Sequence, residues 1–354
     1  LTNLDCNLRC TYCYENKGRG LNDIKQMKNF VTARLKDAEG NQDVILDFIG
    51  GESLLYPDVL DELVTHAHVI QKGIGHTGKI TVSLSTNGTL IDEDKKVQDF
   101  LLKWRPCVGF SIDGTKEIHD ACRIDTEGSP SYDRAVAGWY WTRQHLCPKC
   151  CGVKATYTHT TIGRYAEGVI NLIKLGFIEI AANVVFEEQW TKEEAPIIYK
   201  QMQKVIDYLF EKKLQNTVHI FQINNADLDM RHYKAEGRKA QNHCGTCTHM
   251  RTIGFDGLVY GCNRFCSMKN PIPIGYMDGK KIVITPSGRE FTEEVTAQYK
   301  EWPQECLECK YANQCPSCSA IPYEQDGPKA FFARKPQCGF TYAIVAARLY
   351  FKYR

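Results

Sequence analysis

The chain has 354 residues, of which 43% are hydrophobic and 24% charged, values typical of a globular protein large enough for two domains. Its formal net charge of +2 gives no electrostatic reason to expect a nucleic acid as partner. No apolar run reaches the roughly 18 residues that a spanning helix needs, and no signal peptide stands out, so we expect no membrane partner.

Near the start of the chain, Cys6, Cys10 and Cys13 stand at spacing C-x3-C-x2-C. Three thiolates suit three of the iron corners of a four-iron, four-sulfur cluster and leave the last iron open to bind a substrate or cofactor. A structural zinc ion normally has four protein ligands, so a zinc site here would need a distant fourth residue. On spacing alone, this zinc alternative stays open.

Strand-like and helix-like segments alternate after these cysteines. A strand ending near Leu4 would come first; further strands are predicted at residues 44–49, 79–85, 107–113, 152–158 and 178–186, with helices at 58–71, 97–104, 131–145, 169–173 and 192–213. Such alternation predicts an α/β fold with a parallel sheet and helices outside. Six βα units are too few for a closed eight-stranded barrel, so we predict a partial (β/α)6 barrel. The opening cysteines would lie at the carboxyl end of its strands, where parallel folds bind ligands.

The segment CNLRCTYC, with Tyr12 before the third cysteine, resembles the signature of radical SAM enzymes. The resemblance implies that Cys6, Cys10 and Cys13 hold a 4Fe-4S cluster whose open iron chelates S-adenosylmethionine (SAM). In that family, reductive cleavage of SAM yields a 5'-deoxyadenosyl radical that abstracts hydrogen from the substrate. The cofactors carry this chemistry, and the protein positions them.

Further segments resemble the SAM-binding motifs of that family. Gly50, Gly51 and Glu52 look like the glycine-glycine-glutamate motif that binds the methionine amino group, although Ser53 stands where the family often has proline. The other candidates are Thr86, Asn87, Ser111 and Asp113 as cofactor contacts, Arg123 as partner of the cofactor carboxylate, and Asn183 and Val184 beside the adenine. Each has a plainer alternative: a turn for the glycines and for Asn87, a turn cap for Asp113, a surface arginine for Arg123, and a core strand for the last two.

The C-terminal third holds nine of the 17 cysteines, and FDGLVYGC predicts a β-hairpin around Asp256-Gly257. The cysteine spacing resembles a SPASM domain, which binds two auxiliary 4Fe-4S clusters. One interval differs from the SPASM pattern, because two residues rather than three separate Cys315 from Cys318. The resemblance assigns Cys244, Cys247, Cys262 and Cys318 to one cluster, and Cys306, Cys309, Cys315 and Cys338 to the other. A pair of zinc sites is the alternative.

We therefore predict a radical SAM barrel at 1–215, a bridging segment at 216–243, and at 244–354 a SPASM domain of a short hairpin, loops and helices. The expected cofactors are three 4Fe-4S clusters and SAM. Cys266 is left over, and Cys147, Cys150 and Cys151 are interpreted as incidental or packing thiols.

SPASM enzymes mostly modify peptides or proteins. One branch oxidises Ser or Cys of sulfatases to formylglycine with an Asp base directly after the hairpin cysteine, where this chain has Asn263, which cannot act as a base. We therefore favour a maturase that forms thioether cross-links in a ribosomally made, Cys-containing precursor peptide, with sulfatase maturation as the alternative. A zinc or iron–sulfur binding module is the non-enzymatic alternative.

The expected electron donor is a flavodoxin- or ferredoxin-type protein, and the expected location is the cytoplasm of an anaerobic or low-oxygen prokaryote. Because the chain begins five residues before Cys6, we also expect that residues are missing before Leu1, where such maturases commonly carry a leader-binding domain.

Overall fold

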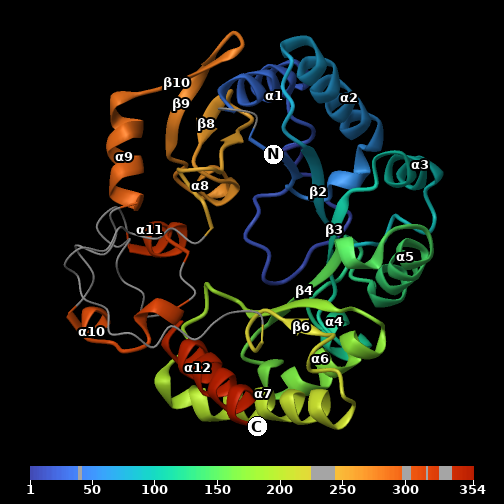
Figure 1. Cartoon of the computed structure of the whole chain (residues 1–354), viewed down its shortest axis with the longest axis vertical. Coiled ribbons are helices and arrows are strands. Elements are labelled where there is room, and N and C mark those ends of the chain that lie inside the picture. Colours follow the sequence, from blue (N-terminus) through green and yellow to red (C-terminus); the bar gives the residue numbers. More distant parts are fainter. Residues whose placement is uncertain (39–41, 225–243, 297–303, 316–317, 327–336) are drawn as a thin grey trace. The chain divides into compact units, whose positions relative to one another are not determined.

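The computed structural model describes residues 1–38, 42–224, 244–296, 304–315, 318–326 and 337–354 (Figure 1). The chain forms two compact units. One comprises Leu1–Phe110, Ile124–Cys150 and Gln241–Thr296, and the other comprises Ser111–Arg123, Cys151–Ala240 and Ala297–Arg354. Each unit combines part of the predicted barrel with part of the cysteine-rich region, and the domain boundaries expected at residues 215 and 244 stay predictions.

Parallel strands form the centre of both units. In the first unit β1 (Val44–Phe48) pairs with β2 (Ile80–Thr86), and β2 pairs with β3 (Cys107–Ser111). In the second unit β4 (Cys151–Tyr157) pairs with β5 (Glu179–Val184), and β5 pairs with β6 (His219–Ile220). All these pairs are parallel, so the predicted α/β class is confirmed.

In the first unit one helix precedes the parallel strands and others follow them. They are α1 (Ile24–Asp37), α2 (Pro57–Ile74), α3 (Lys95–Trp104) and α5 (Tyr132–His145), with the 3-10 turns Ser53–Leu55 and Pro148–Cys150. Local signals fix their ends, because the Asp94 carboxylate accepts bonds from the first amides of α3, and α2 ends at Gly75 with φ of 67°. The apolar face of α3 buries Val97, Phe100 and Leu101, as its periodicity predicts.

The second unit contains α4 (Lys116–Asp120), α6 (Tyr165–Lys174), α7 (Ala195–Glu211) and α12 (Cys338–Tyr353), with 3-10 turns at Ile162–Arg164, Lys192–Glu194 and Ala312–Gln314. Figure 1 shows α7 and α12 side by side. The Tyr350 hydroxyl donates to Asp207 across this contact (2.9 Å), and the rings of Phe210 and Phe351 lie 5.4 Å apart. No helix of the described residues is long and apolar enough to cross a membrane.

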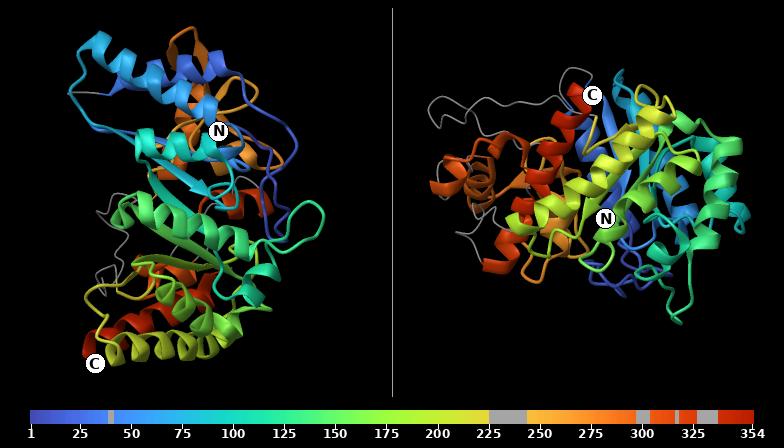
Figure 2. Two further views of the ribbon diagram at one scale, coloured as in Figure 1. Left: turned by 90° about the vertical axis from the view of Figure 1, so that its right-hand side faces the viewer. Right: turned by 90° about the horizontal axis from the view of Figure 1, so that it is seen from below.

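The C-terminal region adds an antiparallel sheet to the first unit, in the order β10-β9-β8-β7. Its strands are β7 (Thr252–Ile253), β8 (Leu258–Tyr260), β9 (Pro273–Asp278) and β10 (Lys281–Ile284); the short helices are α8 (Asn263–Ser267) and α9 (Pro286–Thr296) in this unit, with α10 (Gln304–Leu307) and α11 (Ala320–Asp326) in the other. The predicted hairpin is confirmed, with Gly257 at φ of 76° in its turn. The β9–β10 hairpin lies against α1 (Figure 2).

The strand expected to end near Leu4 stays a prediction, because most of it would precede Leu1. The residues present form an isolated bridge between Asn3 and Leu21 and hydrogen bonds to residues 49–52. The sixth parallel strand is β6, which follows α7.

Candidate functional site

The opening cysteines lie in a loop at the carboxyl end of β1. The segment before the loop is held there because Gly51 N donates to Asn3 O (3.0 Å) and Glu52 N donates to Asp5 O (2.7 Å). Within the loop, Leu8 N donates to the Cys6 sulfur (3.4 Å), and Cys13 N donates to Cys10 O (3.1 Å). Cys6 and Cys10 are half-buried and Cys13 is exposed. The loop thus gathers three thiols beside the predicted SAM-binding motif.

The two glycines of that motif are required by packing. A Cβ atom on Gly50 would stand 2.0 Å from Asn3 O, and one on Gly51 would stand 2.0 Å from Asp5 O. Glycine at both positions thus permits close approach of the protein backbone that leads into the cysteine loop.

Glu52 is a buried carboxylate, only 1% exposed, with neutral donors around it. Thr86 Oγ1 (2.9 Å) and Leu54 N (3.1 Å) donate to Oε1, and Asn87 N (2.7 Å) donates to Oε2. Burial raises the pKa of Glu52 to about 7 despite these hydrogen bonds. The structure therefore brings Glu52, Thr86 and Asn87 together, as predicted, and presents a strong acceptor for an amine.

Asn87 also links this site to the cysteine loop. Its side chain donates to Asn7 Oδ1 (2.8 Å), and Asn7 donates in turn to Thr89 Oγ1 (2.8 Å). Asn7 stands between Cys6 and Cys10, and no sequence motif singled it out. This link couples the position of the loop to the end of β2.

In the second unit, Asp113 and Arg123 form a buried ion pair. Arg123 Nε donates to Asp113 Oδ2 (2.8 Å), and an Arg123 terminal nitrogen donates to Oδ1 (3.1 Å). Thr156 N donates to Oδ1 as well (2.9 Å). The neighbouring His119 is buried, which lowers its pKa to about 3, so it is neutral there. Asp113 thus has a more specific role than a turn cap, and Arg123 is no surface arginine.

The other candidates of the second unit lie on or just after its neighbouring strands. Ser111 ends β3, while Asn183 and Val184 end β5. Asn183 Oδ1 accepts a bond from Gln222 Nε2 (2.6 Å), and Val184 is buried. Their predicted contacts with SAM, like those of Tyr12 and Arg123, stay predictions.

The C-terminal cysteines gather within each unit as far as the structure describes them. In the first unit three thiols lie close enough to interact electrostatically, those of Cys244, Cys247 and Cys262. Burial raises the pKa of Cys247 to about 11. Cys318, the fourth predicted ligand of that cluster, belongs to the second unit, and its assignment stays a prediction.

The four cysteines of the other predicted set line one cavity of the second unit. Around it stand Cys306, Cys309, Cys315, Cys338, Tyr311, Ala312, Thr341 and Tyr342. The Thr341 hydroxyl donates to the Cys315 sulfur (3.4 Å), and the Lys192 ammonium lies 5.6 Å from the centre of the Tyr342 ring. A thiol-lined cavity with a nearby cation fits an anionic iron–sulfur cluster.

Within the described residues, no three His, Cys, Asp or Glu side chains are arranged to hold a single metal ion. In a 4Fe-4S cluster each thiolate binds a different iron.

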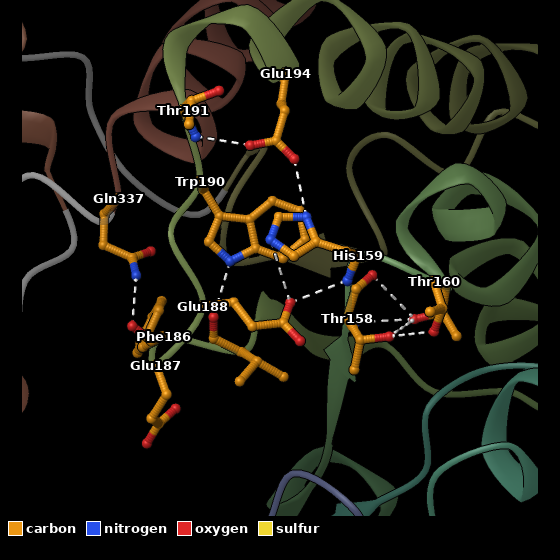
Figure 3. A network of polar contacts seen from close by, with 12 residues as sticks. Thr158, His159, Thr160, Phe186, Glu187, Glu188, Trp190, Thr191, Glu194 and Gln337 are labelled. Carbon is orange, nitrogen blue, oxygen red and sulfur yellow. Dashed lines mark hydrogen bonds and ion pairs between the residues drawn. The ribbon is translucent and has the colours of Figure 1, made fainter.

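A polar network that the sequence motifs missed lies after β4 and β5 in the second unit (Figure 3). The His159 ring stacks on buried Trp190 with centroids 4.1 Å apart. Its Nδ1 lies 2.9 Å from a Glu194 oxygen, and its Nε2 lies 3.7 Å from Glu188. Histidine directly beyond a strand's carboxyl end was the signal available in the sequence. The network thus holds one imidazole ring between an indole and two carboxylates.

In the first unit, α8 packs against the end of the cysteine loop. Asn263 donates to the Tyr14 hydroxyl (3.2 Å), and the Arg264 guanidinium lies 4.0 Å from the centre of the Tyr14 ring. The Cys266 amide donates to Cys262 O (3.3 Å), and burial raises the pKa of the Cys266 thiol to about 12. The segment that follows the third opening cysteine is thereby connected to the C-terminal hairpin region.

Comparisons with known proteins show which family and which proteins this chain resembles. Residues 3–153 match the model of the radical SAM superfamily. A cysteine-type anaerobic sulfatase-maturating enzyme of Clostridium novyi is 34% identical over 145 residues, a match that spans 37% of this chain and 36% of that protein. A cysteine-type enzyme of Clostridium perfringens is 28% identical across 88% of this chain and 84% of that protein. A serine-type enzyme of Bacteroides thetaiotaomicron is 23% identical across 88% and 78%.

Solved structures match the whole fold. A structure described as native anSMEcpe with bound AdoMet and Cp18Cys peptide has a TM-score of 0.72 at 22% identity, covering 99% of this chain and 97% of that one. The same protein with bound AdoMet and Kp18Cys peptide has a TM-score of 0.74 at 21% identity, covering 100% and 98%. The predicted fold class is therefore confirmed over the full length.

Proposed function

The chain carries a radical SAM domain followed by a cysteine-rich region, and from this premise we propose that it oxidises a cysteine or serine of a peptide to formylglycine. The observation that carries the proposal is the similarity to both cysteine-type and serine-type sulfatase-maturating enzymes across 88% of the chain. This similarity supports formylglycine formation better than the thioether cross-link that the sequence motifs favoured.

The first unit supplies residues suited to the cofactors. Cys6, Cys10 and Cys13 would hold the cluster, and Glu52 would accept a hydrogen bond from the methionine amino group of SAM. When bound, these cofactors supply the one-electron chemistry that removes a hydrogen atom from a substrate carbon. Thr86 and Asn87 fix the Glu52 carboxylate from the end of β2, so the acceptor is oriented before SAM arrives.

The reaction also needs an acceptor for a proton. Oxidising the residue by two electrons removes a hydrogen atom from Cβ, and a proton and an electron from the side chain. Water then replaces the sulfur of cysteine, which leaves as hydrogen sulfide. Asn263 cannot take the proton. His159 is our candidate, because a Glu194 oxygen 2.9 Å from its Nδ1 orients the imidazole ring. Replacing His159→Gln should abolish product formation and preserve SAM cleavage without substrate; equal loss of both activities would contradict this role.

The C-terminal cysteines would hold groups suited to take up the remaining electron. Cys306, Cys309, Cys315 and Cys338 would hold one auxiliary cluster, and the set of Cys244, Cys247 and Cys262, with Cys318, would hold another. Fully ligated clusters suit electron transfer. A flavodoxin- or ferredoxin-type protein would deliver the reductant for SAM cleavage.

The test is an anaerobic reaction of the reconstituted chain with SAM, a reductant and peptides carrying a sulfatase-type Cys, Ser or Ala at the target position. The expected products are formylglycine peptides from Cys or Ser, detected by mass spectrometry as loss of hydrogen sulfide with gain of oxygen for Cys and as loss of two hydrogen atoms for Ser. SAM cleavage without formylglycine from either peptide would overturn the proposal.

Thioether formation is the second candidate, and Asn263 in place of the aspartate base is the observation that favours it. A Cys-rich precursor peptide offered in the same assay separates the two reactions. A cross-linked product that retains its sulfur, and no longer reacts with an alkylating reagent, would support this candidate.

A further inference from the structure

The sequence motif LCPKC lies outside every site described above. Cys147 and Cys150 follow α5 and are both exposed, and Cys151 directly after them is buried as the first residue of β4. In the first unit, Cys107 begins β3 and so stands at the strand's amino end, whereas Ser111 marks its carboxyl end. These thiols are therefore remote in sequence and strand position from the predicted cofactor ligands.

A single tight turn brings the two exposed thiols together. The 3-10 turn Pro148–Cys150 is closed by Cys150 N donating to Cys147 O (3.0 Å). The turn is anchored by buried Leu146, whose amide donates to Thr142 O (2.8 Å). A turn closed between residues i and i+3 keeps their Cα atoms within about 7 Å, which is close to the upper limit for a disulfide. Joining Cys147 to Cys150 thus needs little movement of the backbone.

The thiols also contact one another. The Cys150 thiol lies within hydrogen-bonding reach of Cys147 on one side and Cys107 on the other. A backbone amide at Lys149 and the Cys150 thiol both lower the pKa of Cys147. Burial and the neighbouring Cys147 raise the pKa of Cys150. The pair is therefore unequal, with the better nucleophile at Cys147.

We propose that Cys147 and Cys150 form a redox-active dithiol that exchanges with external disulfides. The Cys147 thiolate attacks one sulfur of the external disulfide, forming a mixed disulfide and releasing one thiolate. The Cys150 thiolate then attacks the Cys147 sulfur, which releases the second thiolate and leaves a Cys147–Cys150 disulfide. Two electrons pass from the protein dithiol to the external disulfide, and the two thiol protons end on the released thiolates or in water.

The shared chemistry of the partner is an accessible disulfide, carried by a small thiol or by a protein. Two probes distinguish these sources. The cluster-loaded full chain, kept anaerobic, is treated with glutathione disulfide or with insulin, and each cysteine is assigned by differential alkylation and mass spectrometry. Reaction with glutathione disulfide alone identifies small disulfides as the partner, and reaction with insulin identifies protein disulfides. Reaction with neither probe overturns the proposal.

Variants test the assigned roles. Replacing Cys150→Ser should trap a mixed disulfide at Cys147, and Cys147→Ser should abolish the intramolecular disulfide. Replacing Cys151→Ser provides a matched control, because this adjacent thiol is buried and should leave the exchange intact. Circular dichroism and iron content confirm that each variant is folded. If Cys150→Ser traps nothing at Cys147, or if Cys147 and Cys150 oxidise no faster than buried Cys122, the proposal is wrong.

Discussion

Glu52 in the first unit and Asp113 in the second are both buried carboxylates that follow parallel strands, yet they receive different partners. Glu52 accepts from a hydroxyl and two backbone amides, all neutral. Asp113 accepts two bonds from the Arg123 guanidinium. A buried carboxylate with neutral donors keeps its tendency to bind a proton or an amine, whereas one with a guanidinium partner is already compensated.

This contrast separates two roles that the sequence treated alike. Both residues were candidates for SAM contact. The surroundings of Glu52 suit a ligand that brings its own amine, and the surroundings of Asp113 suit a structural link between the segment after β3 and β4, since Thr156 N also donates to it (2.9 Å). Variants that remove the Arg123 charge or the Glu52 charge separately test this contrast.

Removing the guanidinium should have the largest effect. Arg123→Gln leaves the Asp113 carboxylate buried without its cation, which typically costs roughly 3–5 kcal/mol of unfolding free energy. Chemical denaturation of the cluster-free protein measures the loss. Adding Asp113→Asn should restore part of it. The control is Arg134→Gln, which removes an ion pair to Asp125 at the protein surface and should cost less than about 1 kcal/mol. If the Arg123→Gln variant has the same free energy of unfolding as the unchanged protein, the ion pair between Arg123 and Asp113 has no structural role.

Removing the Glu52 charge should affect binding more than stability. Glu52→Gln retains the shape of the side chain and loses a charged acceptor, so SAM affinity should fall by roughly 2 kcal/mol, more than tenfold. Calorimetry on the cluster-loaded protein measures this change. Unfolding free energy should fall by about 1 kcal/mol, because the amide nitrogen cannot accept the hydrogen bonds that one carboxylate oxygen receives. Glu62→Gln, at a partly exposed partner of Lys28, is the matched control. Unchanged SAM affinity would remove Glu52 from the proposed site.

Local patterns predicted the five longest parallel strands to within a few residues, because each is a run of strand-forming residues bounded by turns. They also located the hairpin, where Asp256-Gly257 marks the turn. The strand β6 was missed because two residues are too few to show a period. The strand expected to end near Leu4 stays a prediction, since only its last residues are present, and they bond to residues 49–52.

Contacts between distant residues were beyond sequence reasoning. The network of His159 with Glu188 and Glu194 joins residues from two loops, and no local spacing indicates it. Residue type alone suggested Glu52 as an acceptor, but its donors come from β2 and from the turn after β1. The requirement for Gly50 and Gly51 comes from backbone atoms of residues 3 and 5, whose proximity only the fold determines.

Changing a glycine beside Glu52 should have a smaller effect on stability than the loss of Arg123. A Cβ on Gly51 would stand 2.0 Å from Asp5 O, so Gly51→Ala should push the cysteine loop away from Glu52 and cost roughly 1–3 kcal/mol. Denaturation and iron content after reconstitution measure the two consequences. Gly73→Ala is the control, because open space surrounds that glycine within α2 and alanine should stabilise the helix by about 0.5–1 kcal/mol. Equal stability of both variants would contradict the packing argument.

The smallest expected effect is the change of SAM affinity with pH. Burial raises the pKa of Glu52 to about 7, so the carboxylate is the main form above that pH and the neutral acid below it. Since the carboxylate is the stronger acceptor, SAM should bind more tightly above pH 7, and affinity should fall by up to about tenfold for each pH unit below it. The same raised pKa means that Glu52 favours the folded state at low pH, and that this contribution is lost as pH rises toward 7, so tighter SAM binding cannot be attributed to a more stable protein. The Glu52→Gln variant should show a flatter profile. A profile that keeps its shape in this variant would assign the titration to another group.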